Sequence, residues 1–331
     1  MTPPRRRYGM TIPFDDVPLA EQRDWIVELE DLGYTDVWSS EANGADAFTP
    51  LALASVWAPS LRLGTAIVPA YTRGPALLAQ QVATLAAAAP GRFAFGLGTS
   101  SDVIVERWNG LEFDDPYYRV RDTVRFLRSA LTGAKTNGDY RGFASHGFRL
   151  GVKVPDEGRV PIFVAALREG MLRLAGREAD GAIINWLSAN DVATVAPIVQ
   201  AQGQSDVQSE GKEIVARIFV APTTDRDTVM ALGRYAIAAY LSVPVYAEFH
   251  RWLGRGEQLA EMWRLWADGD RQGALAAIPD SLVDELIVWG TPEQCREHLD
   301  RYVDNGVTTP VIALLPFGYD QRQAIRDLAP R

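Results

Sequence analysis

Short apolar runs alternate along this chain with longer segments in which apolar positions recur every three to four residues. The short runs are rich in β-branched residues and predict strands, whereas the longer spacing predicts amphipathic helices. Regular alternation of the two is typical of a parallel sheet with helical crossovers. The pattern predicts eight strands, at Arg7–Pro13, Asp36–Ser40, Arg62–Val68, Phe93–Gly98, Ile162–Ala165, Ala182–Asn185, Ile214–Ala221 and Val311–Leu315.

Helical patterns follow most of these strands. Gly33 is a suitable C-terminal stop for the first helix, and Thr291-Pro292 is typical of an N-cap followed by proline in the first helical position. The predicted helices are Pro18–Leu32, Pro75–Ala89, Glu169–Glu178, Thr228–Tyr240, Pro292–Asn305 and Gln321–Asp327. This order favours an α/β fold of the (β/α)8 TIM-barrel type. An open doubly wound sheet is the alternative, because periodicity does not show closure.

Two long segments interrupt the alternation, after the fourth and the seventh strand. The first, about 101–160, contains a helical pattern near Tyr117–Leu131 and a hairpin pattern from Asp139 to Val154. The second, about 240–290, is rich in aromatic residues. Long excursions from a compact barrel are usually lids or binding loops. With 331 residues, the chain fits one barrel domain, 1–331, that carries both insertions.

Composition narrows the function classes. The chain is 47% hydrophobic and 23% charged, which suits a globular protein with a large core. Its formal net charge of −9 argues against nonspecific nucleic-acid binding, and no run of about 18 apolar residues is present to span a membrane. No apolar stretch follows Arg5-Arg6-Arg7 as in a secretion signal, and the lone Cys295 cannot form an internal disulfide. A cytoplasmic protein is expected.

The familiar catalytic signatures are absent from the sequence. There is no Gly-x-Gly-x-x-Gly opening a helix, no Walker loop and no Gly-x-Ser-x-Gly elbow. His146, His250 and His298 lack the spacing of metal ligands, so no metal is expected. His250 lies in the aromatic excursion and is the histidine with a chance of reaching an active site.

The fourth strand ends in unusually small residues. Gly96 and Gly98 occupy alternate positions and would leave one face of the strand bare, and Thr99 and Ser100 follow with hydroxyl groups. A flat ring system could lie on such a surface. The alternative is a tapering barrel strand that needs small residues for packing.

The carboxyl ends of parallel barrel strands converge on the active site. Here those ends are mostly small or apolar, which suits a large flat cofactor that performs the chemistry itself. Glu41 and Glu106 are the candidate catalytic carboxylates, because a carboxylate in a dry barrel mouth can exchange a proton. A salt bridge or loop cap is the alternative for Glu41, and a solvated helix face for Glu106. The strand ends include Ile12, Ala66, Ile67, Gly98, Thr99, Ser100, Ala165, Ala166, Asn185 and Trp186.

Three stretches, Leu63–Pro75, Gln80–Leu85 and Gly91–Ser101, resemble the luciferase-like oxidoreductases of the bacterial luciferase superfamily. The chain is more similar to the branch that depends on the deazaflavin coenzyme F420 than to the flavin monooxygenases. The likeness continues through Glu106–Gly110, Arg119–Val124 and Pro161–Trp186 and is weakest from about 190 to 285.

This resemblance implies a (β/α)8 barrel with a non-proline cis peptide at Ala66–Ile67, in a bulge that supports the ring from behind. It implies that Thr65, Gly98, Thr99 and Ser100 line the ring and that Glu41 lies near its edge. Asn185 and Trp186, at the end of the sixth strand, are further candidate cofactor-binding residues. It also implies that the cofactor phosphate rests on amides after the fifth strand, at Ala166, Leu167 and Arg168, where a helix N-terminus favours anions.

Two departures from the family pattern affect the site. Many relatives have Gly-Pro at Arg168-Glu169, and some place a proton-donating glutamate where this chain has Ser101. Glu41 or Glu106 could take over the donor role, so the proton donor stays unassigned.

The leading interpretation is therefore an oxidoreductase that moves a hydride between coenzyme F420 and an unidentified small organic substrate. An FMN-dependent monooxygenase of the same fold is the alternative enzyme. A catalytically silent protein that binds a flavin or deazaflavin is the third possibility. The resemblance also implies a homodimer.

Overall fold

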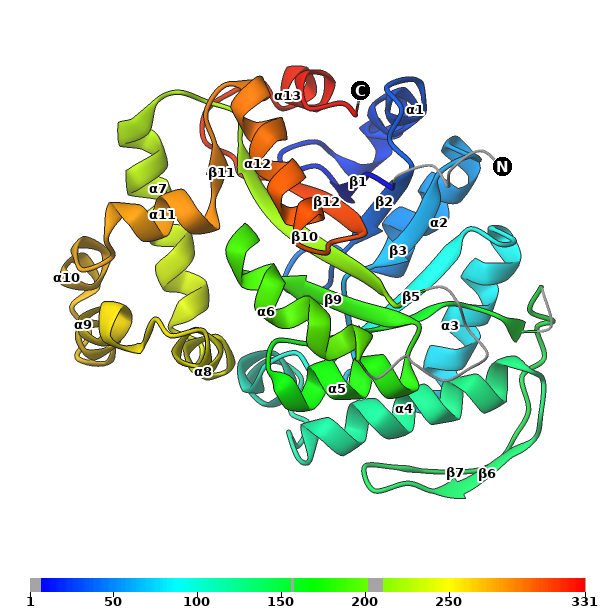
Figure 1. Cartoon of the computed structure of the whole chain (residues 1–331). Coiled ribbons are helices and arrows are strands. Elements are labelled where there is room, and N and C mark those ends of the chain that lie inside the picture. The colour runs from blue at the N-terminus through cyan, green and yellow to red at the C-terminus, as the bar shows by residue number, and fades with distance from the viewer. Residues whose placement is uncertain (1–6, 156–157, 202–210, 331) are drawn as a thin grey trace.

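Eight parallel strands form a closed barrel in the computed structural model, which describes residues 7–155, 158–201 and 211–330 (Figure 1). The last barrel strand pairs with the first, so the open sheet is excluded and the predicted barrel is confirmed. The strands are, in their order around the barrel, β1 (Gly9–Ile12), β2 (Asp36–Ser39), β3 (Arg62–Thr65), β5 (Phe93–Gly98), β8 (Ile162–Ala165), β9 (Gly181–Asn185), β10 (Glu213–Ala221) and β12 (Thr309–Leu314).

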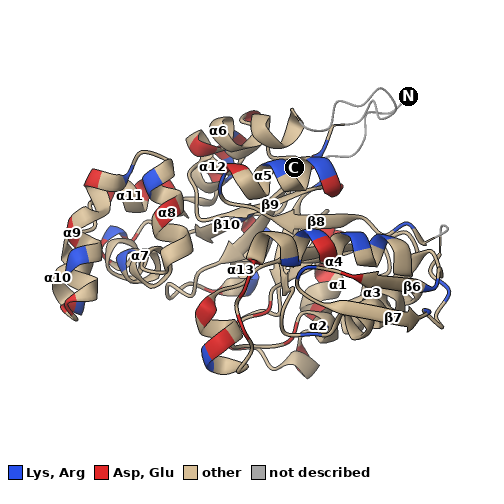
Figure 2. Cartoon of the chain, turned by 90° about the horizontal axis from the view of Figure 1, so that it is seen from below, with Lys and Arg blue, Asp and Glu red and all other residues tan. Residues whose placement is uncertain are grey.

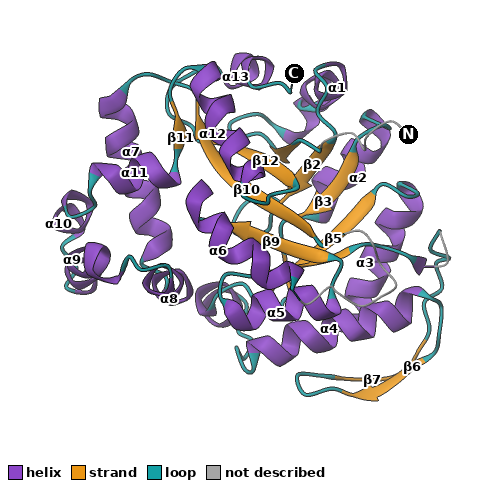
Figure 3. Cartoon of the chain, viewed as in Figure 1, coloured by secondary structure: helices purple, strands orange, loops and turns teal. Residues whose placement is uncertain are grey.

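Helices surround the strands as an outer layer (Figure 3). Charged residues lie mostly on these helices and their loops, while the strands carry few (Figure 2). The first helix begins later than predicted, after a short 3-10 turn at Leu19–Glu21, because the Gln22 side chain instead ties the preceding loop through Phe14 and Val17. The outer helices are α1 (Arg23–Asp31), α2 (Phe48–Trp57), α3 (Pro75–Ala88), α4 (Pro116–Leu131), α5 (Glu169–Glu178), α6 (Ala189–Gln200), α12 (Pro292–Asp304) and α13 (Gln321–Asp327).

Both predicted insertions are present. Between β5 and β8 the chain forms a π-helical turn (Val103–Trp108), helix α4, and a hairpin that begins three residues before the predicted Asp139 and ends at Phe148. Its strands are β6 (Thr136–Asp139) and β7 (Ala144–Phe148). Between β10 and α12 lie α7 (Arg226–Leu241), α8 (Pro244–Trp252), α9 (Gly256–Ala267), α10 (Arg271–Ala276), α11 (Asp280–Leu286) and β11 (Val288–Trp289).

The second insertion has an apolar core of its own. Trp186 and Phe219 from the barrel join buried residues of α7, α9 and α11 in one cluster. Trp263 of α9 donates its indole N–H to the carbonyl of Leu241, 2.8 Å away. Most aromatic residues of the excursion therefore pack the insertion against the barrel wall. That 1–331 forms a single domain stays a prediction.

Within the described part of the chain, no single helix combines the length and apolar character needed to cross a membrane. Helices α7 and α8 meet the criterion only when taken together, across a 101° bend, and only by length and composition.

Candidate active site

The third barrel strand is interrupted at its carboxyl end. Instead of the continuous strand predicted over Arg62–Val68, β3 stops at Thr65 and a short β4 resumes at Val68–Pro69. The Ala66–Ile67 peptide between them is cis, as the resemblance implies. The Ala66 N–H donates to the Ser39 carbonyl at 2.6 Å, and the Glu41 N–H donates to the Ile67 carbonyl at 3.3 Å. The bulge is thus tied to the end of β2.

A cavity of about 1010 Å³ opens at the carboxyl end of the barrel, beside this bulge. Its volume lies at the upper end of the range for small-molecule sites. Most of the site residues expected from the sequence line it. They are Glu41, Ala66, Ile67, Gly98, Thr99, Ser100, Ala166, Leu167, Arg168 and Asn185.

Thr65, Trp186 and Glu106 are not among the lining residues of this cavity. The buried Thr65 hydroxyl accepts the Gly96 N–H at 2.7 Å and donates to the Gly96 carbonyl at 2.9 Å, so it joins β3 to β5 behind the wall. Trp186 is buried against Phe219, with ring centroids 4.1 Å apart. Glu106 is exposed on the π-helical turn. Their roles at the cofactor remain predictions.

His250 is fully buried and also stands outside the cavity lining. Its Nε2 lies 2.9 Å from the Trp186 carbonyl, which can only accept, so Nε2 carries the proton. Nδ1 is buried and has no hydrogen-bond partner among the residues that the structure describes. Burial, aided by the charge of Arg255, lowers the pKa of His250 to about 4. The neutral ring therefore positions Trp186, and its catalytic role stays untested.

This burial makes His250 an acid-sensitive element of the fold. Its pKa is lower in the folded chain than the ordinary 6.5, so the unfolded chain binds the extra proton first as pH falls. The associated stability is complete above pH 6.5 and is lost between about pH 6.5 and 4, in total about 3 kcal/mol. We expect His250→Gln to flatten the pH dependence of the unfolding free energy in this window. Burial also lowers the pKa of His298 to about 4, so His298→Gln should flatten the pH dependence in the same window and shows how much of the slope belongs to each histidine. An unchanged slope in His250→Gln, measured by urea denaturation, would contradict this assignment.

Glu41 faces the cavity but is also held by an ion pair. Arg73 donates to both of its carboxylate oxygens, at 2.5 and 2.7 Å, and the Ala47 N–H donates to Oε2 at 3.1 Å. The salt bridge and the loop cap considered from the sequence are thus both observed. Arg73 stands in the Leu63–Pro75 stretch but was not anticipated as a partner, because a loop partner 32 residues away gives no periodic signal.

Several polar residues of the cavity were missed from the sequence, namely Thr11, Asp15, Arg217 and Tyr246. Arg217 is the one charged residue in the apolar run Ile214–Ala221, and that anomaly was a usable signal. The Tyr246 hydroxyl and the Asn185 amide lie 3.2 Å apart, and burial raises the pKa of Tyr246 to about 12. Burial, and then the neighbouring Asp16, raises the pKa of Asp15.

The first turn of α5 opens onto the same cavity. Glu169, Gly170 and Met171 line it, and the N-cap residue Arg168 makes no side-chain capping hydrogen bond. By contrast, Ser188 caps α6 through a complete capping box. Uncapped N–H groups and the helix dipole favour an anion at this end of the cavity.

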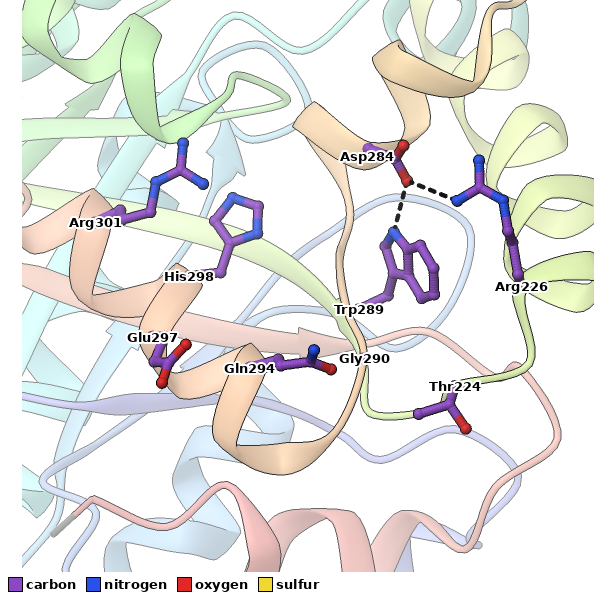
Figure 4. Close-up of a pocket in the computed structure, with 9 residues that line it drawn as sticks. All are labelled: Thr224, Arg226, Asp284, Trp289, Gly290, Gln294, Glu297, His298 and Arg301. Atoms are coloured by element: carbon purple, nitrogen blue, oxygen red, sulfur yellow. Dashed lines mark hydrogen bonds and ion pairs between the residues drawn. The ribbon is translucent and has the colours of Figure 1, made fainter.

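A second, smaller cavity of about 460 Å³ lies beside β11 and α12 (Figure 4). There Asp284 accepts the Trp289 indole N–H at 3.0 Å and pairs with Arg226 at 3.6 Å. None of the expected site residues lines this cavity, so the barrel mouth is the candidate active site. Across the described residues, no group of three or more His, Cys, Asp or Glu side chains is placed to hold a metal ion.

The chain resembles known proteins over nearly its whole length. It is 26% identical over 320 residues to a 5,10-methylenetetrahydromethanopterin reductase of Archaeoglobus fulgidus, covering 94% of each chain. It is 27% identical over 338 residues, again covering 94% of each, to a Mycobacterium tuberculosis protein provisionally named a coenzyme F420-dependent oxidoreductase. The solved F420-dependent tetrahydromethanopterin reductase of Methanopyrus kandleri superposes with a TM-score of 0.80 at 20% identity, covering 98% of this chain and 97% of that one.

A family model described as luciferase-like monooxygenase matches residues 3–309. The match includes every barrel strand from β1 to the start of β12, the bulge at Ala66–Ile67 and the first turn of α5. The chain therefore belongs to the luciferase-like monooxygenase family.

Proposed function

We propose that this protein is a coenzyme F420-dependent oxidoreductase that transfers a hydride to or from a small organic substrate. The observation that carries the proposal is the cavity wall made by the β3 bulge and the end of β5, with the open first turn of α5 in the same cavity. The names of the two relatives, a reductase and an F420-dependent oxidoreductase, support it.

The residues present fit a flat ring. Gly98 stands between Ile67 and Ala165, so closely that an added Cβ would lie 2.9 Å from Ile67 Cδ1 and 3.0 Å from Ala165 Cβ. These three residues form an apolar part of the cavity wall, and Gly98, between the other two, adds no side chain to it. The first turn of α5 would hold a phosphate through its free N–H groups. Bound F420 would supply the hydride carrier, while the protein binds, orients and excludes water.

Two carboxylates of the cavity could hold a proton for the reaction, Glu41 and Asp15. The Arg73 pair fixes the orientation of Glu41, and burial, followed by the charge of Asp16, raises the pKa of Asp15. Glu106 is exposed outside the cavity lining and would need a movement of the π-helical turn to act.

We expect Glu41→Gln to reduce kcat by about 100-fold, the usual size of a lost acid–base contribution, and to change the Kd for F420 by less than about threefold. The amide retains the shape but cannot exchange a proton with the reacting molecules. Steady-state kinetics and fluorescence titration give the two numbers. Glu261→Gln, on the exposed face of α9, is the matched control. Unchanged turnover in Glu41→Gln would remove Glu41 from the mechanism.

Titrating the purified protein with F420 and with FMN, followed by fluorescence, tests the cofactor assignment. FMN is the second candidate because the matching family model is named for monooxygenases. We expect F420 to bind more tightly. Preferential FMN binding with substrate-dependent oxygen uptake would replace the proposal by a monooxygenase. Tight F420 binding without turnover on any substrate of a broad panel would identify a silent binder.

We also propose a cytoplasmic homodimer. The family resemblance supports it, and so do two exposed apolar side chains on neighbouring outer helices, Val56 of α2 and Leu77 of α3, which are 72% and 51% exposed. Light scattering should give twice the chain mass of 36.4 kDa. Introducing Val56→Glu together with Leu77→Glu should halve that mass, and a monomeric wild-type protein would contradict the proposal.

A further inference from the structure

Arg217 is a charged residue of the main cavity that has no role in the proposed function. Val215, two positions earlier on β10, belongs to the apolar cluster inside the barrel with Trp38 and Phe163. Alternation along the strand therefore turns Arg217 to the same interior side, one layer nearer the carboxyl end. It lines the cavity there, beside its register partner Asn185 on β9.

The guanidinium of Arg217 has no acidic partner within ion-pair distance among the described residues, and its buried Nε makes no hydrogen bond there. The other charged groups of the cavity differ in this respect. Glu41 pairs with Arg73, Glu169 with Arg173, and Arg168 approaches Glu248 at 3.9 Å. Asp15, at the cavity mouth, feels the charge of Arg217 without pairing with it.

Aromatic stacking holds the guanidinium in place instead. Its central carbon lies 5.1 Å from the ring centroid of Phe219. Phe219 in turn stacks on Trp186 at 4.1 Å, and Trp186 on Tyr240 at 4.6 Å. A stacked arginine keeps its planar donor edge free for a carboxylate or phosphate. The buried hydroxyl of Thr11 on β1, which likewise has no hydrogen-bond partner in the described part of the chain, faces the same cavity.

The strand order places this group across the barrel from the proposed ring wall. From β3 the barrel runs β5, β8, β9, β10 in one direction and β2, β1, β12, β10 in the other. Arg217 therefore faces the bulge at Ala66–Ile67 from the opposite wall. The space between is bordered near the mouth by apolar and aromatic side chains, including Ile104, Trp108, Tyr240 and Trp252.

We propose that Arg217 is the substrate-recognition residue and that the substrate carries an oxyanion, a carboxylate or phosphate, on an apolar body. This inference rests on the proposed function, because it assigns the wall opposite Arg217 to the cofactor. The fork of Arg217 would bind the oxyanion, and the aromatic rim would cover the apolar part.

Calorimetric titration with benzoate, phenyl phosphate and the neutral isostere benzamide tests the proposal, on the protein alone and loaded with F420. We expect the better anionic probe to bind at least about 10-fold more weakly to Arg217→Met, since hydrogen bonds to a charged partner are lost. Benzamide and F420 should bind as they do to wild type. Arg217→Lys should lose part of the affinity, because it keeps the charge without the fork. Arg264→Met, an exposed arginine on α9 outside the cavity lining, is the matched control.

Three results would overturn the assignment. They are no binding of either anion to wild type, equal anion binding by wild type and both Arg217 variants, and a loss of F420 affinity in Arg217→Met with anion binding retained. Failure of wild type to bind F420 would instead refute the proposed function. Anion binding to the protein alone would still test Arg217 in that case. If Arg217→Met does not fold, the Arg217→Lys comparison alone decides between these outcomes.

Discussion

Gly96→Ala is expected to destabilise the barrel severely, whereas Gly98→Ala, two residues further along the same strand, should fold and bind F420 poorly. An added Cβ on Gly96 would lie 1.9 Å from the carbonyl oxygen of Thr65, a backbone atom that cannot turn aside. The same Cβ would also meet Ile183 Cδ1 at 2.4 Å. We expect a loss of at least about 3 kcal/mol of unfolding free energy, at the upper end of the cost of overpacking.

At Gly98 an added Cβ meets only side-chain atoms, of Ile67 and Ala165, at 2.9 to 3.0 Å. The Ile67 side chain can turn aside, and the Ala165 Cβ has to move only a few tenths of an ångström together with the backbone of β8, so we expect a cost of about 1 kcal/mol. The shift deforms the wall proposed for the ring, and F420 should bind about 10-fold more weakly. Urea unfolding and fluorescence titration of both variants measure the two effects. Equal stability of the two variants would contradict the conclusion that glycine is required at these two positions for different structural reasons.

This pair shows what a sequence pattern can and cannot separate. Both glycines mark close approach, as their place in a strand predicts. Gly96, however, leaves room for the backbone of β3, so the alternative considered from the sequence, a strand that needs small residues for packing, applies to it. Of the two glycines, only Gly98 lines the cavity. The two glycines have different neighbours because of the register of β3 against β5 beside the bulge. The alternation of residues along one strand does not reveal that register.

The strands were the most predictable part of the fold, because each is a short apolar run between turn signals. Helices α2, α6 and α8 to α11 were not predicted as elements, whereas α7 was predicted as Thr228–Tyr240. Seven of the ten residues of α2, Phe48–Trp57, are apolar, and two of them, Ala52 and Val56, lie on its exposed side, so the sequence shows no single apolar face. The second insertion was recognised only from its aromatic content.

The candidate site was predictable where residues follow strand ends in the chain, as at Ala66, Gly98, Ala166 and Asn185. The expected residues that do not line the cavity have side chains directed elsewhere, and their roles at the cofactor stay predictions. Trp186 follows Asn185 directly, but its positive φ of 51° and its stacking on Phe219 place it behind the wall. Arg217 was missed because it lies inside a strand, where a single charged residue looks like a break in the apolar pattern and not like a site residue.

Arg62→Met is expected to cost about 3–5 kcal/mol of unfolding free energy, the usual effect of breaking a buried ion pair from one side. Arg62 closes the amino end of the barrel, where its guanidinium pairs with Asp36 and with both carboxylate oxygens of Glu213, at 2.5 and 3.0 Å from the latter. Methionine keeps most of the volume but removes the cation shared by Glu213 and the fully buried Asp36, which keeps a longer ion pair with Arg7, at 3.5 Å. Thr309 would still donate to Glu213, at 2.5 Å, and would offset only part of the loss.

The pH dependence separates this charge effect from a packing effect. Burial alone would raise the pKa of Glu213, but the hydrogen bonds and charge of Arg62 outweigh it and lower the pKa below its ordinary 4.5. That stabilisation is complete above pH 4.5 and is lost as pH falls through the folded-state pKa. In Arg62→Met burial dominates, so protonation of Glu213 relieves the variant. As pH falls from 7, the stability gap between wild type and Arg62→Met should therefore begin to narrow above pH 4.5, when Glu213 of the variant takes up its proton. Arg62→Met combined with Glu213→Gln should be more stable at pH 7 than Arg62→Met alone. A gap that stays constant from pH 7 to pH 4 would show that packing, and not the ion pair, is what Arg62 contributes.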